Sequence, residues 1–119
     1  MITGIGTDIV EVKRIEKLLD DEKFLDKIFT KKEKEYFESK KNKSQSIAAG
    51  FAGKEAVSKA FGTGISKFSF RDIEILHNEK NAPYVVLHNG AKKICDGAKV
   101  WISLTHEKGY AMAFAVTEK

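Results

Sequence analysis

The chain has 119 residues, of which 42% are hydrophobic and 32% charged, with a formal net charge of +4. These values are typical of one globular domain and exclude a disordered chain. The positive excess favours an anionic partner, such as a nucleotide, a nucleic acid or an acidic protein, without choosing among them.

The sequence offers no targeting or disulfide signal. The first residues lack a basic region followed by a long apolar run, which excludes a signal peptide, and no segment has the ~18 apolar residues of a membrane helix. Cys95 is the single cysteine, so an internal disulfide is excluded and we interpret it as a small core residue. We therefore expect a soluble, cytoplasmic protein.

The first half predicts one strand followed by helices. Alternation predicts the strand, and a capping-box pattern at Thr30 and Glu33 marks the start of one helix. The elements are a strand over 1–10, helical spacing over 9–19, a short helix over 24–29, a helix over 30–37 and a longer helix over 46–61.

The second half predicts mostly strands. Strands are expected over 68–76, 84–88, 100–106 and 110–117, with turns over 78–83 and 107–109 and a short helix over 89–99 closed by Gly97. The last two strands form a hairpin. The pattern predicts an α+β fold, with helices packed on a mostly antiparallel sheet.

Asp8 allows two interpretations. It precedes a helical pattern, and Glu11 lies three residues later, as in a helix N-cap with a capping box. If the strand continues past it, Gly4 and Gly6 share its face and leave room for a ligand beside the carboxylate. The local sequence leaves both interpretations open.

Glu55 and Lys59 lie four residues apart on the longest predicted helix, with the acid on the N-terminal side. At about 100° per residue, both fall inside the arc of small residues. A solvent-exposed ion pair would lie opposite that arc, and a partly buried charge is costly unless it is paired or liganded. The pair is therefore a candidate site.

Gly62, Thr63 and Gly64 follow this helix. A phosphate-binding loop precedes its helix, where free N–H groups and the positive end of the dipole face the anion, so the order excludes a P-loop. Gly62 is interpreted as a left-handed helix cap, which leaves Gly64 unexplained. Of the three histidines, His106 ends a predicted strand beside a turn, and His77 and His88 have no comparable setting.

Three segments carry a family resemblance: GIGTDIVEVKRI near the start, FAGKEAVSKAFGTGI in the middle and WISLTHEKGYAMAFAV at the end. In this order and spacing they resemble holo-(acyl-carrier-protein) synthase, the small bacterial 4′-phosphopantetheinyl transferase. The resemblance covers nearly the whole chain. The K-E-A-x-x-K-A core together with the upstream G-x-D is specific, whereas either motif alone is not.

The resemblance implies a single domain over residues 1–119 that transfers 4′-phosphopantetheine from coenzyme A to a serine of apo-acyl carrier protein, in fatty acid biosynthesis. The other product is adenosine 3′,5′-bisphosphate. It also implies Mg²⁺, for which two carboxylates are suitable hard ligands, and a homotrimer with active sites between subunits. No nucleic acid or membrane is expected as a partner.

The resemblance assigns roles to individual residues. Asp8 and Glu55 match the metal-binding acids, and Lys59, beside the diphosphate, completes the catalytic set. The serine proton would pass to Glu55 or to a metal-held water. The coenzyme A site would be lined by Lys59, Gly62, Thr63, Gly64, Ile65, Pro83 and His106. Lys13 and Arg14 lie on the helix that meets the carrier protein in the family.

Two positions depart from the family pattern. Members commonly carry a basic residue where this chain has Gly50, and Gly-Lys where it has Asn81 and Ala82. If the basic group holds a nucleotide phosphate, its loss weakens binding unless Lys54 or another lysine substitutes.

Two other functions are alternatives to the transferase. One is a small basic nucleic-acid-binding module, but this function gives no role to Asp8 and Glu55, whose charges would repel phosphates. The other is a metal-free protein-interaction domain.

Overall fold

The computed structural model describes residues 1–119, with the exception of the side chain of Ser66. The three longest strands form one antiparallel sheet in the order β1 (Ile2–Glu11), β5 (Tyr110–Glu118), β4 (Lys99–Glu107). β4 and β5 form the predicted hairpin, whose turn contains Gly109 at φ +84°, a left-handed conformation that glycine adopts without strain. A separate two-stranded sheet pairs β2 (Ile73–His77) with β3 (Pro83–Leu87).

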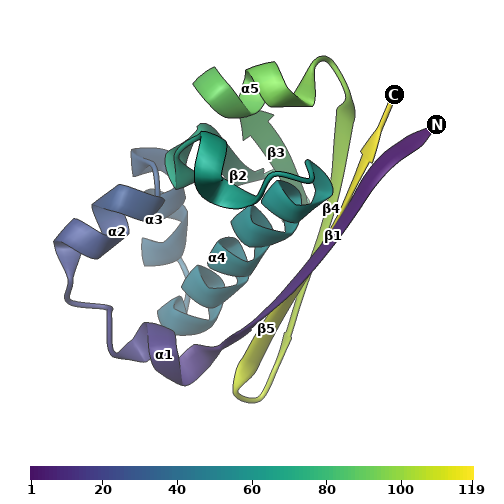
Figure 1. The fold of residues 1–119 in the computed structure, drawn as a ribbon. Coiled ribbons are helices and arrows are strands. Elements are labelled where there is room, and N and C mark those ends of the chain that lie inside the picture. Colours follow the sequence, from purple (N-terminus) through teal and green to yellow (C-terminus); the bar gives the residue numbers. More distant parts are fainter.

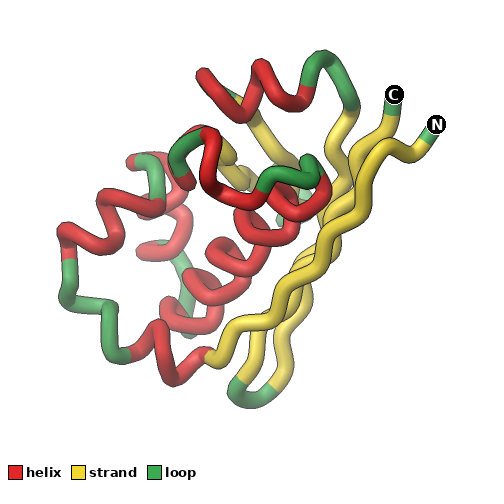
Figure 2. The backbone as a smooth tube through the Cα atoms, in the orientation of Figure 1, coloured by secondary structure: helices red, strands yellow, loops and turns green.

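The helices lie on one side of the three-stranded sheet. They are α1 (Val12–Glu16), α2 (Glu22–Ile28), α3 (Lys31–Glu38), α4 (Lys43–Ala60) and α5 (Asn89–Cys95), with short 3₁₀ turns η1 (Gly64–Lys67) and η2 (Phe70–Asp72). Figure 1 shows α4 running along one face of the sheet, and Figure 2 shows the other helices on that same side. The predicted α+β fold is confirmed. Among the described residues, no helix combines the length and the apolar character needed to cross a membrane.

Several predicted boundaries are wrong. The helix expected over 46–61 is observed at Lys43–Ala60, and the one expected over 89–99 ends at Cys95. Two further boundaries have a clear physical reason. Residues 68–72 do not extend β2, because the Ser69 hydroxyl accepts a hydrogen bond from the Arg71 N–H and the Asp72 carboxylate accepts one from the Ser69 N–H. These local bonds close a 3₁₀ turn instead of a strand. At the other end of the chain, the helical spacing expected from Ile9 begins only at Val12, since β1 continues to Glu11.

The continuation of β1 decides between the two interpretations of Asp8. Asp8 pairs with Ala113 inside the sheet, and the position before α1 is Glu11, whose side chain makes no capping bond. The N-cap interpretation is therefore wrong, and Asp8 projects from a strand.

Gly4 and Gly6 lie against α4. A Cβ atom at Gly4 would lie 1.8 Å from the carbonyl oxygen of Ala60, and one at Gly6 would lie 1.9 Å from that of Ala56. Any side chain here would push the helix off the sheet. The space that we expected for a ligand beside Asp8 is filled by the helix, so that expectation is wrong.

A buried ion pair joins α3 and α4 to β2. The Lys54 ammonium donates to the Glu33 carboxylate at 2.9 Å and to the carbonyl oxygens of Phe70 and Ile73 at 3.0 and 2.5 Å. The second Glu33 oxygen accepts the Ile75 N–H at 2.9 Å. Burial lowers the pKa of Lys54, and the Glu33 carboxylate opposes that shift. Each charge is thus matched by several hydrogen bonds, as a charge inside a core requires.

Gly6→Ala tests the strand–helix contact. Because the added methyl group meets a backbone carbonyl, we expect the free energy of unfolding to fall by about 3 kcal/mol, the upper part of the range for overpacking. Urea unfolding followed by circular dichroism measures the change. Lys23→Ala, at an exposed position of α2 and away from this sheet, should stay within about 0.5 kcal/mol. Equal midpoints for both variants would contradict the proposed contact.

Candidate functional site

Asp8, Glu55 and Lys59 form the first cluster of candidate functional side chains. The Lys59 ammonium donates to the Thr7 carbonyl oxygen at 2.9 Å and to the Asp8 carboxylate at 3.3 Å. Glu55 lies one helical turn before Lys59, on the edge of α4 that faces β1, and is only partly exposed. The structure therefore brings Asp8 of β1 together with Glu55 and Lys59 of α4.

The electrostatics of this cluster favour a positively charged ligand. Burial raises the pKa of the Glu55 carboxyl, the negative charge of Asp8 raises it further, and Lys59 lowers it. A raised pKa means that the ionised form is disfavoured where it stands. Burial is the largest cause and the charge of Asp8 the second, so a cation placed beside both carboxylates would favour the ionised form of Glu55.

The donor set suits a hard divalent cation but is incomplete by itself. Asp8 and Glu55 offer carboxylate oxygens, which Mg²⁺ prefers. Among the residues that the structure describes, no group of three or more histidine, cysteine, aspartate or glutamate side chains could hold a metal ion. An ion at Asp8 and Glu55 would need its other ligands from water or from a bound anion.

The segment after α4 adopts the predicted cap. Gly62 has φ +81°, and its N–H donates to the Lys59 carbonyl at 2.9 Å. Gly64 has φ +63° and starts η1, and a Cβ atom at either glycine would meet no atom within 4 Å. Gly64, which capping alone left unexplained, is thus a second left-handed position beside open space, while Ile65 packs partly into the core.

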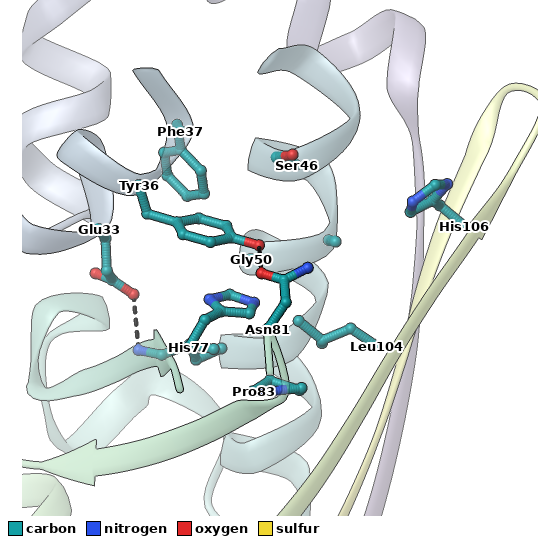
Figure 3. A pocket seen from close by; sticks show the side chains of 12 residues that line it. Glu33, Tyr36, Phe37, Ser46, Gly50, His77, Asn81, Pro83, Leu104 and His106 are labelled. Carbon is teal, nitrogen blue, oxygen red and sulfur yellow. Dashed lines mark hydrogen bonds between the residues drawn. The ribbon is translucent and has the colours of Figure 1, made fainter. Parts of the chain in front are cut away.

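A cavity of about 150 Å³ lies on the other side of α4 (Figure 3). It contains Pro83 and His106, two of the residues expected at a coenzyme A site, together with Gly50. The other lining residues are Glu33, Tyr36, Phe37, Ser46, Ala49, Ile75, His77, Asn81 and Leu104. Figure 3 shows Tyr36, His77 and Asn81 gathered on one wall, with His106 on the strand opposite.

The two groups of candidate residues lie on different sides of one helix. Gly50 and Glu55 are about 140° apart around α4 at about 100° per residue. Pro83 and His106 therefore share a cavity with Gly50 and not with the cluster of Asp8, Glu55 and Lys59. Within one chain, the structure does not unite the expected metal ligands with the expected nucleotide contacts.

Lys13 and Arg14 are exposed on α1. This short helix follows β1 directly and is tied to the β4–β5 turn by a hydrogen bond from the Val12 N–H to the Gly109 carbonyl at 2.8 Å. The buried side of the helix is formed by Val12 and Ile15. Both basic side chains are thus free to contact a partner.

Sequence reasoning missed the polar wall of the cavity. His77 is stacked on Tyr36, with ring centroids 3.9 Å apart and an angle of 1° between the planes, and the Tyr36 hydroxyl donates to the Asn81 side chain at 2.9 Å. The sequence pointed toward this region only through Pro83, His106 and the family departures at Gly50 and Asn81, and not through Tyr36 or His77. His88, in contrast, pairs with Glu74 at 3.0 Å, which agrees with a structural role.

Comparison with known proteins identifies the family. The pattern of the 4′-phosphopantetheinyl transferase superfamily matches residues 4–115. The chain belongs to this superfamily. It is 52% identical over 116 residues to a holo-(acyl-carrier-protein) synthase of Thermoanaerobacter sp. (strain X514), which covers 94% of this chain and 84% of the relative.

Solved structures agree with this family. A holo-(acyl-carrier-protein) synthase from Neisseria meningitidis has a TM-score of 0.90 and 38% identity, and the match covers 100% of both chains. The enzyme from Bacillus anthracis str. Ames, in complex with CoA (3′,5′-ADP), has a TM-score of 0.86 and 39% identity, covering 100% of this chain and 98% of that one. The expected family and fold are confirmed, and the nucleic-acid-binding and protein-interaction interpretations are replaced.

Glu55→Gln tests the electrostatic strain in the first cluster. Because the pKa of Glu55 is raised on folding, the folded chain binds this proton more tightly than the unfolded chain, and stability falls as pH rises through that window. The Glu55→Gln side chain does not ionise, so this variant does not lose that stability as the pH rises. We expect it to melt at a higher temperature than the unsubstituted chain at pH 7.5, by a few degrees at most because the group is partly solvated.

The difference should shrink as the pH falls and disappear near pH 3, more than one unit below the ordinary pKa of about 4.3, where the carboxyl is protonated in both states. Thermal unfolding followed by circular dichroism at both pH values measures it. Glu35→Gln, exposed on α3, is the matched control. A lower melting temperature for Glu55→Gln at pH 7.5 would mean that the ionised carboxylate stabilises the fold.

Proposed function

We propose that this chain transfers the 4′-phosphopantetheine group from coenzyme A to a serine hydroxyl of apo-acyl carrier protein, with adenosine 3′,5′-bisphosphate as the other product. The observation that carries the proposal is the meeting of Asp8, Glu55 and Lys59 between β1 and α4. Residues 1–119 form one transferase domain in this proposal, since strands and helices from both halves share a core. A cytoplasmic location stays a prediction.

The cluster supplies the groups that this transfer needs. The serine oxygen forms a bond to the phosphorus next to pantetheine, and the bond from that phosphorus to the oxygen of adenosine 3′,5′-bisphosphate breaks. Asp8 and Glu55 would hold Mg²⁺, which when bound neutralises charge on the diphosphate. The Lys59 ammonium stabilises the charge on the departing phosphate.

Glu55 is the candidate acceptor for the serine proton. Its pKa is raised by burial and by Asp8, which suits a proton acceptor as long as no cation lies on the carboxylate, because a bound cation lowers the pKa again. With Mg²⁺ held by Glu55, a water at the metal would accept the proton instead. Coenzyme A would extend past Lys59 along Gly62, Thr63, Gly64 and Ile65. Lys13 and Arg14 offer two exposed positive charges to the acidic carrier protein.

The enzyme should assemble as a homotrimer with active sites between subunits. The outer face of the three-stranded sheet carries a contiguous apolar patch, whose members are 42% to 62% exposed: Ile5, Ile9, Trp101, Met112 and Phe114. Monomeric proteins rarely expose such a patch. Because His106 and Pro83 lie across α4 from the cluster, a second copy would complete each site.

The transfer itself is tested with coenzyme A, Mg²⁺ and apo-acyl carrier protein. We expect the carrier to gain one phosphopantetheine by mass spectrometry. Glu55→Gln should lower the rate by roughly 10²–10⁴-fold because it removes a ligand and the candidate proton acceptor, whereas Glu35→Gln should keep it. A carrier of unchanged mass at every metal and carrier concentration would refute the proposed function.

The shared site is tested by mixing two impaired variants, Glu55→Gln and His106→Ala. If one subunit supplies Glu55 and its neighbour supplies His106, co-refolded mixtures should recover about one quarter of the full activity, since one site in four is then intact. Each variant refolded alone is the control, and size-exclusion chromatography with light scattering gives the assembly. Activity no higher than the mean of the two variants would place both residues in a site within one chain.

A further inference from the structure

Position 50 cannot supply the basic side chain that the family commonly carries there. A Cβ atom at Gly50 would lie 3.1 Å from the Phe37 ring and 3.4 Å from the Phe29 ring. These rings pack edge to face, with centroids 4.9 Å apart. A side chain at position 50 would require these rings to shift by a few tenths of an ångström. Because position 50 is glycine, α4 contributes no cation to the cavity there.

Lys54, the substitute suggested by the sequence, cannot take this role. Its Nζ is fully buried and donates to Glu33, Phe70 and Ile73. Turning Lys54 toward a ligand would leave the Glu33 charge buried without its partner, which is strongly unfavourable. Of the two substitutes that the sequence left open, Lys54 or another lysine, Lys54 is therefore excluded.

Lys40 lies at the rim of the cavity with its charge available. Its Nζ is 3.4 Å from the Asn81 side-chain oxygen and 4.7 Å from the centroid of the Tyr36 ring. Tyr36 and Asn81 both line the cavity, and the Tyr36 hydroxyl donates to the same Asn81 oxygen at 2.9 Å. Among the described residues, no carboxylate lies within 4.0 Å of the Lys40 ammonium.

The charges that line the cavity leave it open to an anion. Glu33 is the one carboxylate among its lining residues, and both Glu33 oxygens are engaged by Lys54, by the Thr30 N–H and by the Ile75 N–H. His77 has its pKa lowered by burial and then by the charge of Lys40. The field of Lys40 thus reaches the cavity wall.

We propose that Lys40 binds the 3′-phosphate at the nucleoside end of coenzyme A, and that Asn81, fixed by Tyr36, holds the lysine in place. This inference rests on the proposed function. The diphosphate belongs to the cluster of Asp8, Glu55 and Lys59, so the 3′-phosphate is the remaining anionic group that the cavity could recognise. The departures at Gly50 and Asn81 are then linked: α4 carries no cation at position 50, and Asn81 in the turn before β3 holds Lys40.

Lys40→Met tests the assignment against Lys41→Met, which removes an exposed neighbouring lysine. We expect the KM for coenzyme A to rise about tenfold for Lys40→Met, as for loss of one hydrogen bond to a charged group, with little change in kcat. The KM for 3′-dephospho-coenzyme A should be the same in both variants. Lys40→Arg should recover most of the lost affinity.

Asn81→Gly tests the positioning role without loss of the fold. Asn81 has φ +63°, which glycine adopts freely, so the turn should form while the amide that holds Lys40 is gone. The KM for coenzyme A should rise several-fold, less than for Lys40→Met. The double variant should add little, because both changes remove one interaction.

Calorimetric titration of adenosine 3′,5′-bisphosphate and of adenosine 5′-monophosphate gives a readout independent of turnover. Lys40→Met should weaken binding of adenosine 3′,5′-bisphosphate and leave binding of adenosine 5′-monophosphate unchanged. Equal bisphosphate affinity and equal KM for Lys40→Met and Lys41→Met would overturn the assignment. An unsubstituted chain that binds the bisphosphate but leaves the carrier unmodified would refute the proposed function and still test Lys40.

Discussion

The close contact between β1 and α4 determines where the chemistry of this protein can occur. Gly4 and Gly6 let the carbonyl oxygens of Ala60 and Ala56 approach the strand at distances that any side chain would block. Since a strand alternates its side chains between two faces, the next residue on the same face is Asp8. Its carboxylate therefore meets Lys59 within hydrogen-bond distance. The two glycines thus shape the site by letting β1 and α4 lie close together. The space that the sequence suggested for a ligand beside them is occupied by α4.

The buried pair of Lys54 and Glu33 fixes the other half of the molecule. One ammonium and one carboxylate tie α4, α3, η2 and β2 together through charge-assisted bonds. Such a pair adds less net stability than its number of bonds suggests, because desolvation offsets the attraction. Its requirement for matched geometry nonetheless fixes how α3 and β2 lie against α4. The cavity wall of Tyr36 and His77 depends on that placement.

The sequence predicted the elements and the first cluster better than the cavity. Asp8, Glu55 and Lys59 belong to short sequence motifs. Helical periodicity alone placed Glu55 and Lys59 among the small residues of the helix, where a solvent-exposed ion pair is not expected. The strand expected over 68–72 failed because Ser69 and Asp72 bond locally, which alternation does not register. Tyr36, His77 and Asn81 come from separate elements and have no spacing rule in common. Their contact follows from tertiary packing, and Lys54 looked free only because its partner Glu33 lies 21 positions away.

The two halves of the site differ in how freely their residues can be exchanged. The cluster on β1 and α4 is held by backbone contact, so moving its acids would require moving a strand against a helix. The cavity wall is built from a helix end and a turn, where Asn81 already occupies a left-handed backbone position that several residue types can take. In the proposed assignment, Lys40 can therefore take the place of a cation at position 50 without a change in the fold. In the proposed site, the residues that recognise the nucleoside end can therefore change without moving an element, whereas the placement of Asp8 against Lys59 is set by the contact between β1 and α4.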